Sequence, residues 1–230
     1  MKSRMSDLIS NYQTKQVLII DNQPVCREGM TAILAAENLS VYGASSSVSD
    51  ALALLEKSCP DLIITDITLT DGNGIDFIKS AKSICKNVNI LVFTSLDETI
   101  YAERAIQAGA KGYVMKQAPI SEFVEALKKV FSGKVHLSPA MTERMLLRKS
   151  EGVRSEVSSI DTLSDRELEV FQMIGEGKPT LEIARCLHLS IKTIETYRAK
   201  IKFKLNLSNN IELITHAFEW RQNAQMCKVA

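Results

Sequence analysis

The feature that most constrains the fold is an alternation of short apolar runs with longer segments of helical period, between residue 16 and about residue 132. Four runs are strongly aliphatic or β-branched, and the second is weaker. Runs of this length and composition are typical of buried strands in a parallel sheet. The runs are Val17–Ile20, Ser40–Ala44, Leu62–Thr65, Ile90–Phe93 and Tyr113–Met115.

Between and after these runs, apolar residues recur at helical spacing. The segments are Val25–Ala36, Val48–Leu55, Ile75–Ile84, Ile100–Ala108 and Ile120–Phe131. Strands that alternate with helices predict βαβ units with right-handed crossovers. We therefore expect an α/β doubly wound domain with a five-stranded parallel sheet over residues 15–133, preceded by a tail at 1–14.

The remainder of the chain carries no strand pattern. Residues 134–160 are expected to be a linker with a helix from Pro139, because SEGVRSEVSSI (150–160) is serine-rich and poor in apolar residues. Ser164 and Glu167 form an S-x-x-E capping box ahead of an apolar periodic segment. Three further helical segments follow, at 180–187, 191–205 and about 209–222. Residues 161–230 are therefore predicted to form an all-α domain of four helices.

Composition excludes several classes of protein. An apolar fraction of 45% and a charged fraction of 24% are ordinary for a globular chain. The 28 Lys and Arg against 27 Asp and Glu give no overall sign of a nucleic-acid partner. The five cysteines form an odd, scattered set, so we expect small core residues in a reducing compartment, without a disulfide framework or zinc site. No run approaches a membrane span or signal peptide, which predicts a soluble, cytoplasmic protein.

Polar residues follow four of the predicted strands. Asp21 and Asp66 come directly after the first and third runs, Thr94 and Ser95 after the fourth, and Lys116 after the fifth. An Asp after a strand is often only a turn or cap residue. The carboxyl ends of parallel strands, however, lie along one edge where ligands bind. We therefore expect these side chains to converge on one small cleft.

These residues resemble those of a known family. The set Asp21, Asp66, Thr94, Tyr113 and Lys116 is similar to that of the receiver domain of bacterial two-component response regulators. The stretch DITLTDGNG (66–74) resembles its phosphoacceptor loop, and RAIQAGAKGYVMK (104–116) its fourth helix and fifth strand. The resemblance implies phosphoryl transfer from a sensor histidine kinase to Asp66 with Mg²⁺.

The resemblance also implies a role for each residue. Lys116, Thr94 and Ser95 would contact the phosphoryl group, and Tyr113 would be the switch aromatic. The Mg²⁺ ligands would be Asp21, Asn22, Asp66 and Thr68. A carboxylate that attacks phosphorus needs its charge offset, and a cation with a positioned lysine meets that need.

The sequence departs from the family pattern at three places. Asn22 stands where the family usually has a second acid, which removes one negative charge from the expected Mg²⁺ site. Thr70-Asp71 replace the usual Pro-Gly, and Gln117 follows Lys116. We expect Asp66 to be phosphorylated, but more weakly or slowly than usual. The alternative is a phosphorylation-independent receiver that serves as a dimerisation or protein-interaction module.

The predicted helix at 191–205 is amphipathic and basic. Ile194, Ile201 and Leu205 share one face, and residues 190–204 hold five basic residues against one acid, Glu195. Lysines alone are typical of any solvated helix. The stretches LSDREL (163–168), GKPTLEIARCLHLS (177–190), KTIETYRAKIKFKL (192–205) and NIEL (210–213), however, resemble the LuxR-type helix-turn-helix. Its second helix lies in the major groove of double-stranded DNA.

By position, the resemblance implies two sets of DNA contacts. The base-reading candidates are Glu195, Thr196 and Ala199. The phosphate candidates are Lys192, Thr193, Lys200 and Lys202. Similar domains form DNA-bound homodimers through the last helix, in which Ile211, Ile214 and Phe218 are expected in the core and Trp220 is left undecided.

Together the two domains resemble a NarL/FixJ-class response regulator. We expect a DNA-binding transcriptional regulator controlled by phosphorylation of Asp66, and not an enzyme that turns over an external substrate. A phosphohydrolase with Asp66 as nucleophile is a remote alternative, because Thr68 stands where such enzymes carry a general acid. The three histidines, His136, His188 and His216, are too scattered to predict a metal site.

Overall fold

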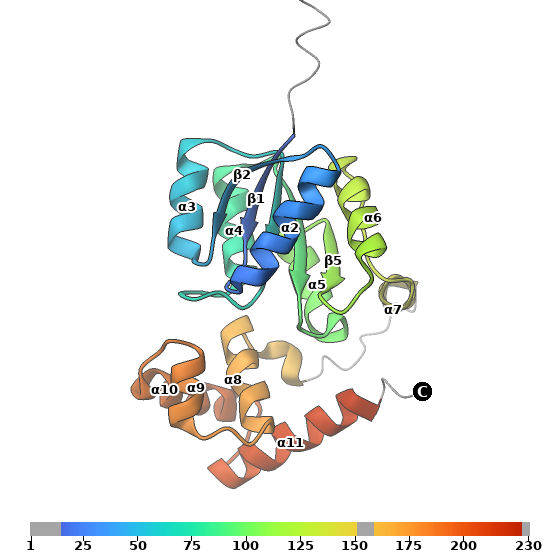
Figure 1. Cartoon of the computed structure of the whole chain (residues 1–230). Helices are drawn as coiled ribbons and strands as arrows, with labels where there is room; N and C mark the ends of the chain where they lie inside the picture. The colour runs from blue at the N-terminus through green and yellow to red at the C-terminus, as the bar shows by residue number, and fades with distance from the viewer. Residues whose placement is uncertain (1–14, 151–158, 227–230) are drawn as a thin grey trace, which may run out of the picture. The chain divides into compact units, whose positions relative to one another are not determined.

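The computed structural model describes residues 15–150 and 159–226 (Figure 1). The chain divides into two compact units, Met1–Leu146 and Leu147–Ala230. Within the described ranges, no helix is long and apolar enough to cross a membrane.

The first unit is built on a five-stranded parallel sheet with the order β2-β1-β3-β4-β5. Its strands are β1 (Gln16–Ile20), β2 (Ser40–Ser45), β3 (Leu62–Thr65), β4 (Asn89–Thr94) and β5 (Gly112–Met115). The helices between and after them are α2 (Pro24–Ala36), α3 (Val48–Lys57), α4 (Gly74–Ile84), α5 (Glu98–Ala108) and α6 (Ile120–Phe131). The predicted doubly wound α/β fold is confirmed.

Burial on both faces explains why the central strands are continuous apolar runs. All four residues of β3 are fully buried, as are Val17 to Ile20 of β1. Val17 and Ile19 pack in one cluster with Leu34 of α2 and Phe123 of α6, and these helices cover the same face in Figure 1. Along the sheet, α3 contacts α4 and α4 contacts α5. The sheet is therefore enclosed between two helical layers.

The chain beyond α6 continues to pack against the sheet. The N–H of His136 donates to Lys111 O at 2.9 Å, and the N–H of Tyr113 donates to His136 O at 3.0 Å, which adds a short parallel bridge beside β5. Helix α7 spans Pro139–Ser150, and its Met141 is buried. Residues 151–158, most of the serine-rich segment expected to be a linker, lie outside the described residues.

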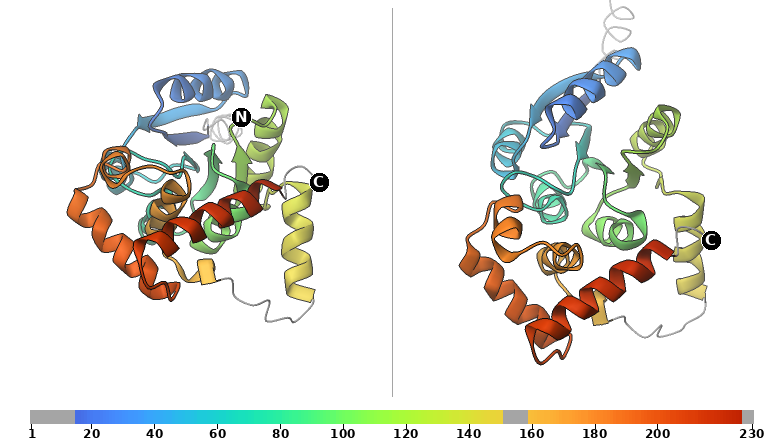
Figure 2. Two further views of the ribbon diagram at one scale, coloured as in Figure 1. Left: turned by 90° about the horizontal axis from the view of Figure 1, so that it is seen from below. Right: turned by 60° about the horizontal axis from the view of Figure 1, so that its bottom comes forward.

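From residue 159 to residue 226, the second unit contains the 3₁₀ helix η1 (Ser159–Thr162) and four α-helices, as the residue pattern predicted (Figure 2). These are α8 (Asp165–Gly175), α9 (Thr180–Cys186), α10 (Ile191–Lys204) and α11 (Asn210–Met226). The predicted capping box at the start of α8 is present, with both the Ser164 and Glu167 side chains bonded to backbone N–H groups. Gly175 allows close approach of α8 to α11, because a Cβ there would lie 2.5 Å from Ala217 O.

The prediction for the core face of α11 is wrong. Ile211, Ile214 and Phe218 are exposed, at 77%, 47% and 54%. The buried residues are Leu213 and Ala217, which share one face with Trp220 because they are four and three residues apart. The undecided Trp220 is half-buried, with its ring 5.6 Å from that of Phe171. Because apolar residues lie on both sides of α11, the sequence pattern did not show which side of the helix is buried.

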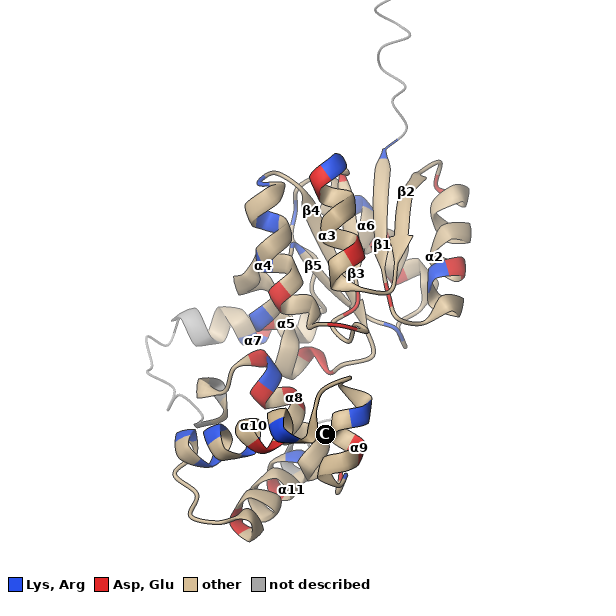
Figure 3. Ribbon diagram, turned by 90° about the vertical axis from the view of Figure 1, so that its left-hand side faces the viewer, with Lys and Arg blue, Asp and Glu red and all other residues tan. Residues whose placement is uncertain are grey.

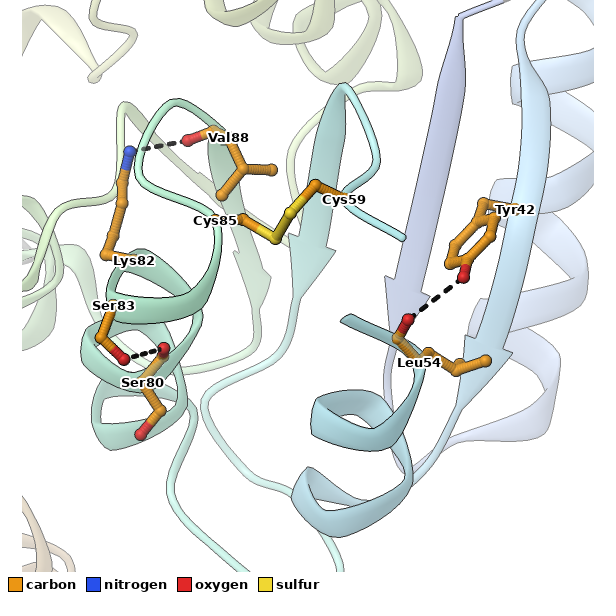
Figure 4. The surroundings of a disulfide bond; sticks show 8 residues. All are labelled: Tyr42, Leu54, Cys59, Ser80, Lys82, Ser83, Cys85 and Val88. Carbon is orange, nitrogen blue, oxygen red and sulfur yellow. Dashed lines mark hydrogen bonds between the residues drawn. A yellow bond between two sulfur atoms is a disulfide. The ribbon is translucent and has the colours of Figure 1, made fainter. Parts of the chain in front are cut away.

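The expectation that the cysteines form no disulfide is also wrong. Cys59 and Cys85 form a disulfide, although 26 positions separate them (Figure 4). Of the remaining cysteines, Cys26 is half-buried, Cys186 is exposed and Cys227 lies outside the described residues. The β3–α4 unit folds back on itself, which brings the end of α4 beside the loop ahead of β3. The two cysteines therefore meet in the fold, and their spacing in the sequence did not predict this contact.

Candidate functional site

The carboxyl edge of the sheet gathers the polar residues that follow the strands. Asp21 follows β1, Asp66 follows β3, Thr94 ends β4, and Lys116 follows β5. Asp21 and Thr94 are fully buried, and Asp66 is 4% exposed. The expected convergence is present: Lys116 contacts both carboxylates and Thr94 contacts Asp66.

The Asp66 carboxylate is held by four donors. Oδ1 accepts hydrogen bonds from the Thr94 hydroxyl at 2.5 Å and from the backbone N–H groups of Ile67 at 2.6 Å and Thr68 at 3.3 Å. Oδ2 accepts from the Lys116 ammonium at 2.8 Å. This environment stabilises negative charge at one oxygen with neutral donors and at the other with a cation.

Lys116 bridges the two carboxylates. Its Nζ lies 2.7 Å from Asp21 Oδ2 and 2.8 Å from Asp66 Oδ2, and its side chain is only 9% exposed. Burial lowers the pKa of Lys116, but hydrogen bonds to Asp21 and Asp66 outweigh burial, so the net shift is upward. The pKa of Asp21 is raised, because its burial outweighs the hydrogen bonds from Lys116 and the Gln23 N–H. The Lys116 charge therefore only partly offsets the desolvation of Asp21.

The oxygen ligands at this edge fit a small hard cation. Oδ1 of Asn22 is buried and accepts no hydrogen bond within the part of the chain described, so it is free to coordinate. Asp21 and Asp66 supply carboxylates, the ligands Mg²⁺ prefers. The half-buried Thr68 follows Asp66 and donates its N–H to it. Among the described residues, no group of three or more His, Cys, Asp or Glu side chains could hold a metal ion, so a cation here would depend on neutral oxygens as well.

A chain of hydrogen bonds joins Thr94 to Tyr113. The Leu96 N–H donates to the Thr94 hydroxyl at 3.3 Å, and Leu96 O accepts from the Tyr113 hydroxyl at 2.9 Å. The Tyr113 ring is buried, and this burial raises its pKa well above the ordinary value, so the phenol remains a proton donor. Ser95, the other hydroxyl expected at the cleft, is exposed.

The loop after β3 is anchored by two residues at which the sequence departs from the family pattern. Asp71 accepts hydrogen bonds from the Val48 N–H at 2.5 Å, the Ser49 N–H at 3.0 Å and the Ser49 hydroxyl at 2.7 Å. Thr70 donates to Ser46 O through its N–H and its hydroxyl. Burial raises the pKa of Asp71, but these hydrogen bonds outweigh burial and lower the pKa overall. Thr70 and Asp71 thus fasten the loop to the start of α3.

Gly74, the first residue of α4 after this loop, is a residue that sequence reasoning did not single out. A Cβ at this position would lie 2.1 Å from Asp66 O and 2.7 Å from Ile67 Cα. The Gly74 N–H donates to Ile67 O at 2.7 Å, which closes the loop onto the backbone beside Asp66. Only glycine permits this close approach. The glycine at the end of the stretch DITLTDGNG was the sequence feature that could have indicated this close backbone approach.

In the second unit, α9 and α10 form a helix-turn-helix. Ile194 and Ile201 of α10 are buried, as is Leu205 directly after the helix, which agrees with the predicted pattern. Of the five basic residues of this segment, one is buried and one is paired with an acid of the same unit. Arg198 is 8% exposed, and Lys204 binds Glu167 at 2.6 Å and Thr162 O at 3.1 Å.

Lys192, Lys200 and Lys202 are the three remaining lysines of α10, a helix whose basic positions are blue in Figure 3. Lys192 and Lys200 are exposed, Lys202 is half-buried, and Thr193 lies in the first turn, where its N–H donates to the Ser190 hydroxyl. The basic face of α10 therefore has three lysines, fewer than the five basic residues counted between positions 190 and 204.

The base-reading candidates share the exposed side of α10. Glu195, Thr196 and Ala199 are all exposed. Glu195 accepts a hydrogen bond from the Thr180 hydroxyl at 3.0 Å, and the Thr196 hydroxyl donates to Lys192 O at 2.9 Å. Both side chains keep further acceptor sites for contact with a base edge, because a carboxylate has two oxygens and a donating hydroxyl can still accept.

Comparisons with known proteins match one family to each of the two units. Residues 17–128 match the response regulator receiver domain, and residues 161–217 match the bacterial regulatory proteins of the luxR family. A putative transcriptional regulator of Pseudomonas aeruginosa is 33% identical over 88% of this chain and 96% of its own. The virulence regulator BvgA of Bordetella pertussis is 31% identical over 86% of this chain and 94% of its own.

A solved structure is similar to this chain over most of its length. RcsB of Salmonella enterica, bound to promoter DNA in the presence of a phosphomimetic, is 28% identical to this chain. The alignment covers 88% of this chain and 97% of that protein, with a TM-score of 0.54.

Proposed function

Since the chain belongs to the two-component response regulators that join a receiver domain to a LuxR-type DNA-binding domain, we propose that phosphorylation of Asp66 controls its binding to DNA. The chain is thus a transcriptional regulator of a two-component system. The observation that carries the proposal is the Asp66 carboxylate held between the Lys116 ammonium and the Thr94 hydroxyl. A sensor histidine kinase is the proposed phosphoryl donor.

The chemistry follows from these contacts. A carboxylate oxygen of Asp66 attacks phosphorus, and the bond from phosphorus to the donor breaks. Lys116 offsets charge on the phosphoryl oxygens, and the N–H groups of Ile67 and Thr68 point into the same space. Asp21, Asn22 and Asp66 would hold Mg²⁺, with Thr68 next to it, and the ion would neutralise phosphoryl charge.

The same geometry supports a route for the signal. The Thr94 hydroxyl now donates to Asp66, and a phosphoryl group would offer it a more negative acceptor. Because Leu96 bonds to Thr94 through its N–H and to Tyr113 through its carbonyl, movement of Thr94 disturbs the Tyr113 hydrogen bond. Tyr113 therefore responds to the state of Asp66 through the backbone on either side of Leu96.

Incubation with Mg²⁺ and acetyl phosphate tests phosphorylation. Intact-protein mass spectrometry should detect one added phosphoryl group on the wild type and none on Asp66→Asn. Asp50→Asn, at an exposed position on α3, is the matched control and should accept the group as the wild type does. Equal labelling of Asp66→Asn and the wild type would overturn the assignment.

A phosphorylation-independent receiver is the second candidate function. The observation that favours it is Asn22, which leaves two carboxylates at the cation site, while Lys116 already pairs both. Comparison of Asp66→Ala with unphosphorylated and phosphorylated wild type separates the two candidates. If all three bind promoter DNA equally, the receiver acts without phosphorylation. A location in the cytoplasm and the absence of external turnover remain predictions, and an assay on phosphate esters tests the latter.

For the DNA complex we propose α10 as the recognition helix of a homodimer bound to double-stranded DNA. Lys192, Thr193, Lys200 and Lys202 would contact phosphates, and Glu195, Thr196 and Ala199 would contact bases. The exposed apolar face of α11 supports a dimer contact, because such a face gains stability when a second copy covers it. Its residues are Ile211, Ile214 and Phe218.

Substitution on α11 tests the dimer. Phe218→Glu should abolish the dimer measured by analytical ultracentrifugation on promoter DNA, while the exposed neighbour Glu219→Ala should retain it. A dimer of unchanged stability in Phe218→Glu would exclude this face as the contact.

A further inference from the structure

The disulfide between Cys59 and Cys85 lies within the receiver unit, away from the phosphorylation site. Cys59 is in the loop between α3 and β3, and Cys85 follows the last residue of α4 (Figure 4). We propose that the pair is a redox site that interconverts between a dithiol and a disulfide by exchange with a small disulfide such as oxidised glutathione. The inference uses neither phosphorylation nor DNA binding, so it is independent of the proposed function.

The exposures of the two residues set the order of exchange. Cys59 is exposed, whereas Cys85 is 4% exposed. The Cys59 thiolate attacks the small disulfide, which forms a mixed disulfide and releases one small thiol. The Cys85 thiolate then attacks the Cys59 sulfur and releases the second small thiol. Two electrons pass from the protein to the small disulfide, and the two cysteine protons balance the two released thiols.

The surrounding fold holds both cysteines without help from the bond between them. Strand β3 pairs with β1 on one side and β4 on the other, and α4 buries Ile75, Phe77, Ile78 and Ala81. The Cys85 N–H donates to Ala81 O at 2.8 Å, and Cys85 O accepts from the Val88 N–H at 3.1 Å. The Cα atoms are 5.8 Å apart, within the range that a disulfide spans. The reduced protein therefore keeps the two thiols in position to reform the bond.

The position of the disulfide determines what oxidation changes. The bond closes a covalent loop around β3, the segment containing Asp66, and α4. Closing a loop of this length restricts the unfolded chain and stabilises the folded receiver. Cys59 precedes β3 and Asp66 follows it, so the disulfide and the carboxylate lie at opposite ends of the strand. We expect oxidation to raise the Tm of the receiver by about 10 °C.

The test uses the full chain with Cys26→Ser, Cys186→Ser and Cys227→Ser, so that only this pair can react. The protein is equilibrated in glutathione buffers that range from reduced to oxidised, quenched in acid and alkylated. Mass spectrometry should show both thiols disappearing together in oxidised buffer and both returning with dithiothreitol. The Tm should follow this change. Adding Cys59→Ser, at an exposed position expected to tolerate the change, should remove the response of Tm to the buffer.

Three results would overturn the proposal. The first is that both thiols remain free in oxidised glutathione. The second is that dithiothreitol does not reduce the disulfide while the protein is folded. The third is that the Tm is the same in both redox states. Because no phosphoryl donor or DNA is present, none of these results bears on Asp66. A cooperative thermal transition in both redox states shows that the fold is retained and separates loss of the fold from loss of the redox response.

Discussion

The Thr94 hydroxyl donates a hydrogen bond of 2.5 Å to Oδ1 of Asp66, between side chains that are both buried. Removing this hydroxyl should uncouple DNA binding from phosphorylation. We expect Thr94→Ala to be labelled by acetyl phosphate but to lose the gain in DNA affinity on phosphorylation, a gain of roughly 5–150-fold in typical coupled systems. Thr94→Ser keeps the hydroxyl and should keep the gain. The measurement is DNA affinity with and without acetyl phosphate.

Restoring the second acid should strengthen cation binding. Oδ1 of Asn22 is buried without a hydrogen-bond donor among the described residues, so an Asp here would add charge at a position free to coordinate. We expect Asn22→Asp to lower the Mg²⁺ concentration for half-maximal phosphorylation about tenfold, equivalent to ~1.4 kcal/mol. Asn87→Asp adds the same charge at an exposed residue of the α4–β4 loop and should change nothing. An unchanged Mg²⁺ dependence in Asn22→Asp would remove Asn22 from the cation site.

Asp71 should stabilise the receiver in a pH-dependent way. Its carboxylate accepts from the Val48 and Ser49 N–H groups at the start of α3, so Asp71→Ala should lower the free energy of unfolding by about 1 kcal/mol at pH 7. The folded pKa lies below 3.8, so this stability is present above pH 3.8 and is lost as pH falls through the folded pKa. Urea denaturation of wild type and variant from pH 7 to pH 3 measures the difference. Asp76→Ala, an exposed acid at the start of α4, is the control.

The sequence predicted the parts of the receiver that depend on local pattern. Strands buried on both faces must be continuously apolar, so β1, β3 and β4 were evident as runs. Because parallel strands end at one edge, the positions of Asp21, Asp66 and Lys116 along the chain were enough to predict that they meet.

Contacts between residues distant in the sequence could not be predicted in the same way. Asp71 bonds to Val48 across 23 positions, and Cys59 bonds to Cys85 across 26. An aspartate or a cysteine does not indicate by its type or its position in the sequence which distant residue it will contact. On α10, the charge pattern placed Arg198 with the exposed lysines, although the fold buries it. A long side chain can reach a neighbouring helix in the core, so charge alone did not settle its position.

The contacts of Lys200 and Lys204 predict different consequences of removing each charge. Lys200 is exposed, whereas the Lys204 ammonium is 2.6 Å from Glu167 in the capping box of α8. Lys200→Ala should weaken DNA binding equally at all sequences and reduce the slope of log affinity against log salt by about one. Lys204→Ala should leave that slope unchanged and lower the free energy of unfolding of the second unit by about 1 kcal/mol.

Glu167 explains the second effect. Burial raises its pKa, but hydrogen bonds from Lys204 and Ser164 outweigh burial and lower the pKa, so the carboxylate depends on these donors. DNA affinity measured at several salt concentrations and urea denaturation of each variant distinguish the two lysines. If Lys204→Ala instead reduced the salt slope while unfolding like the wild type, Lys204 would be a phosphate contact and its ion pair with Glu167 would be broken on DNA.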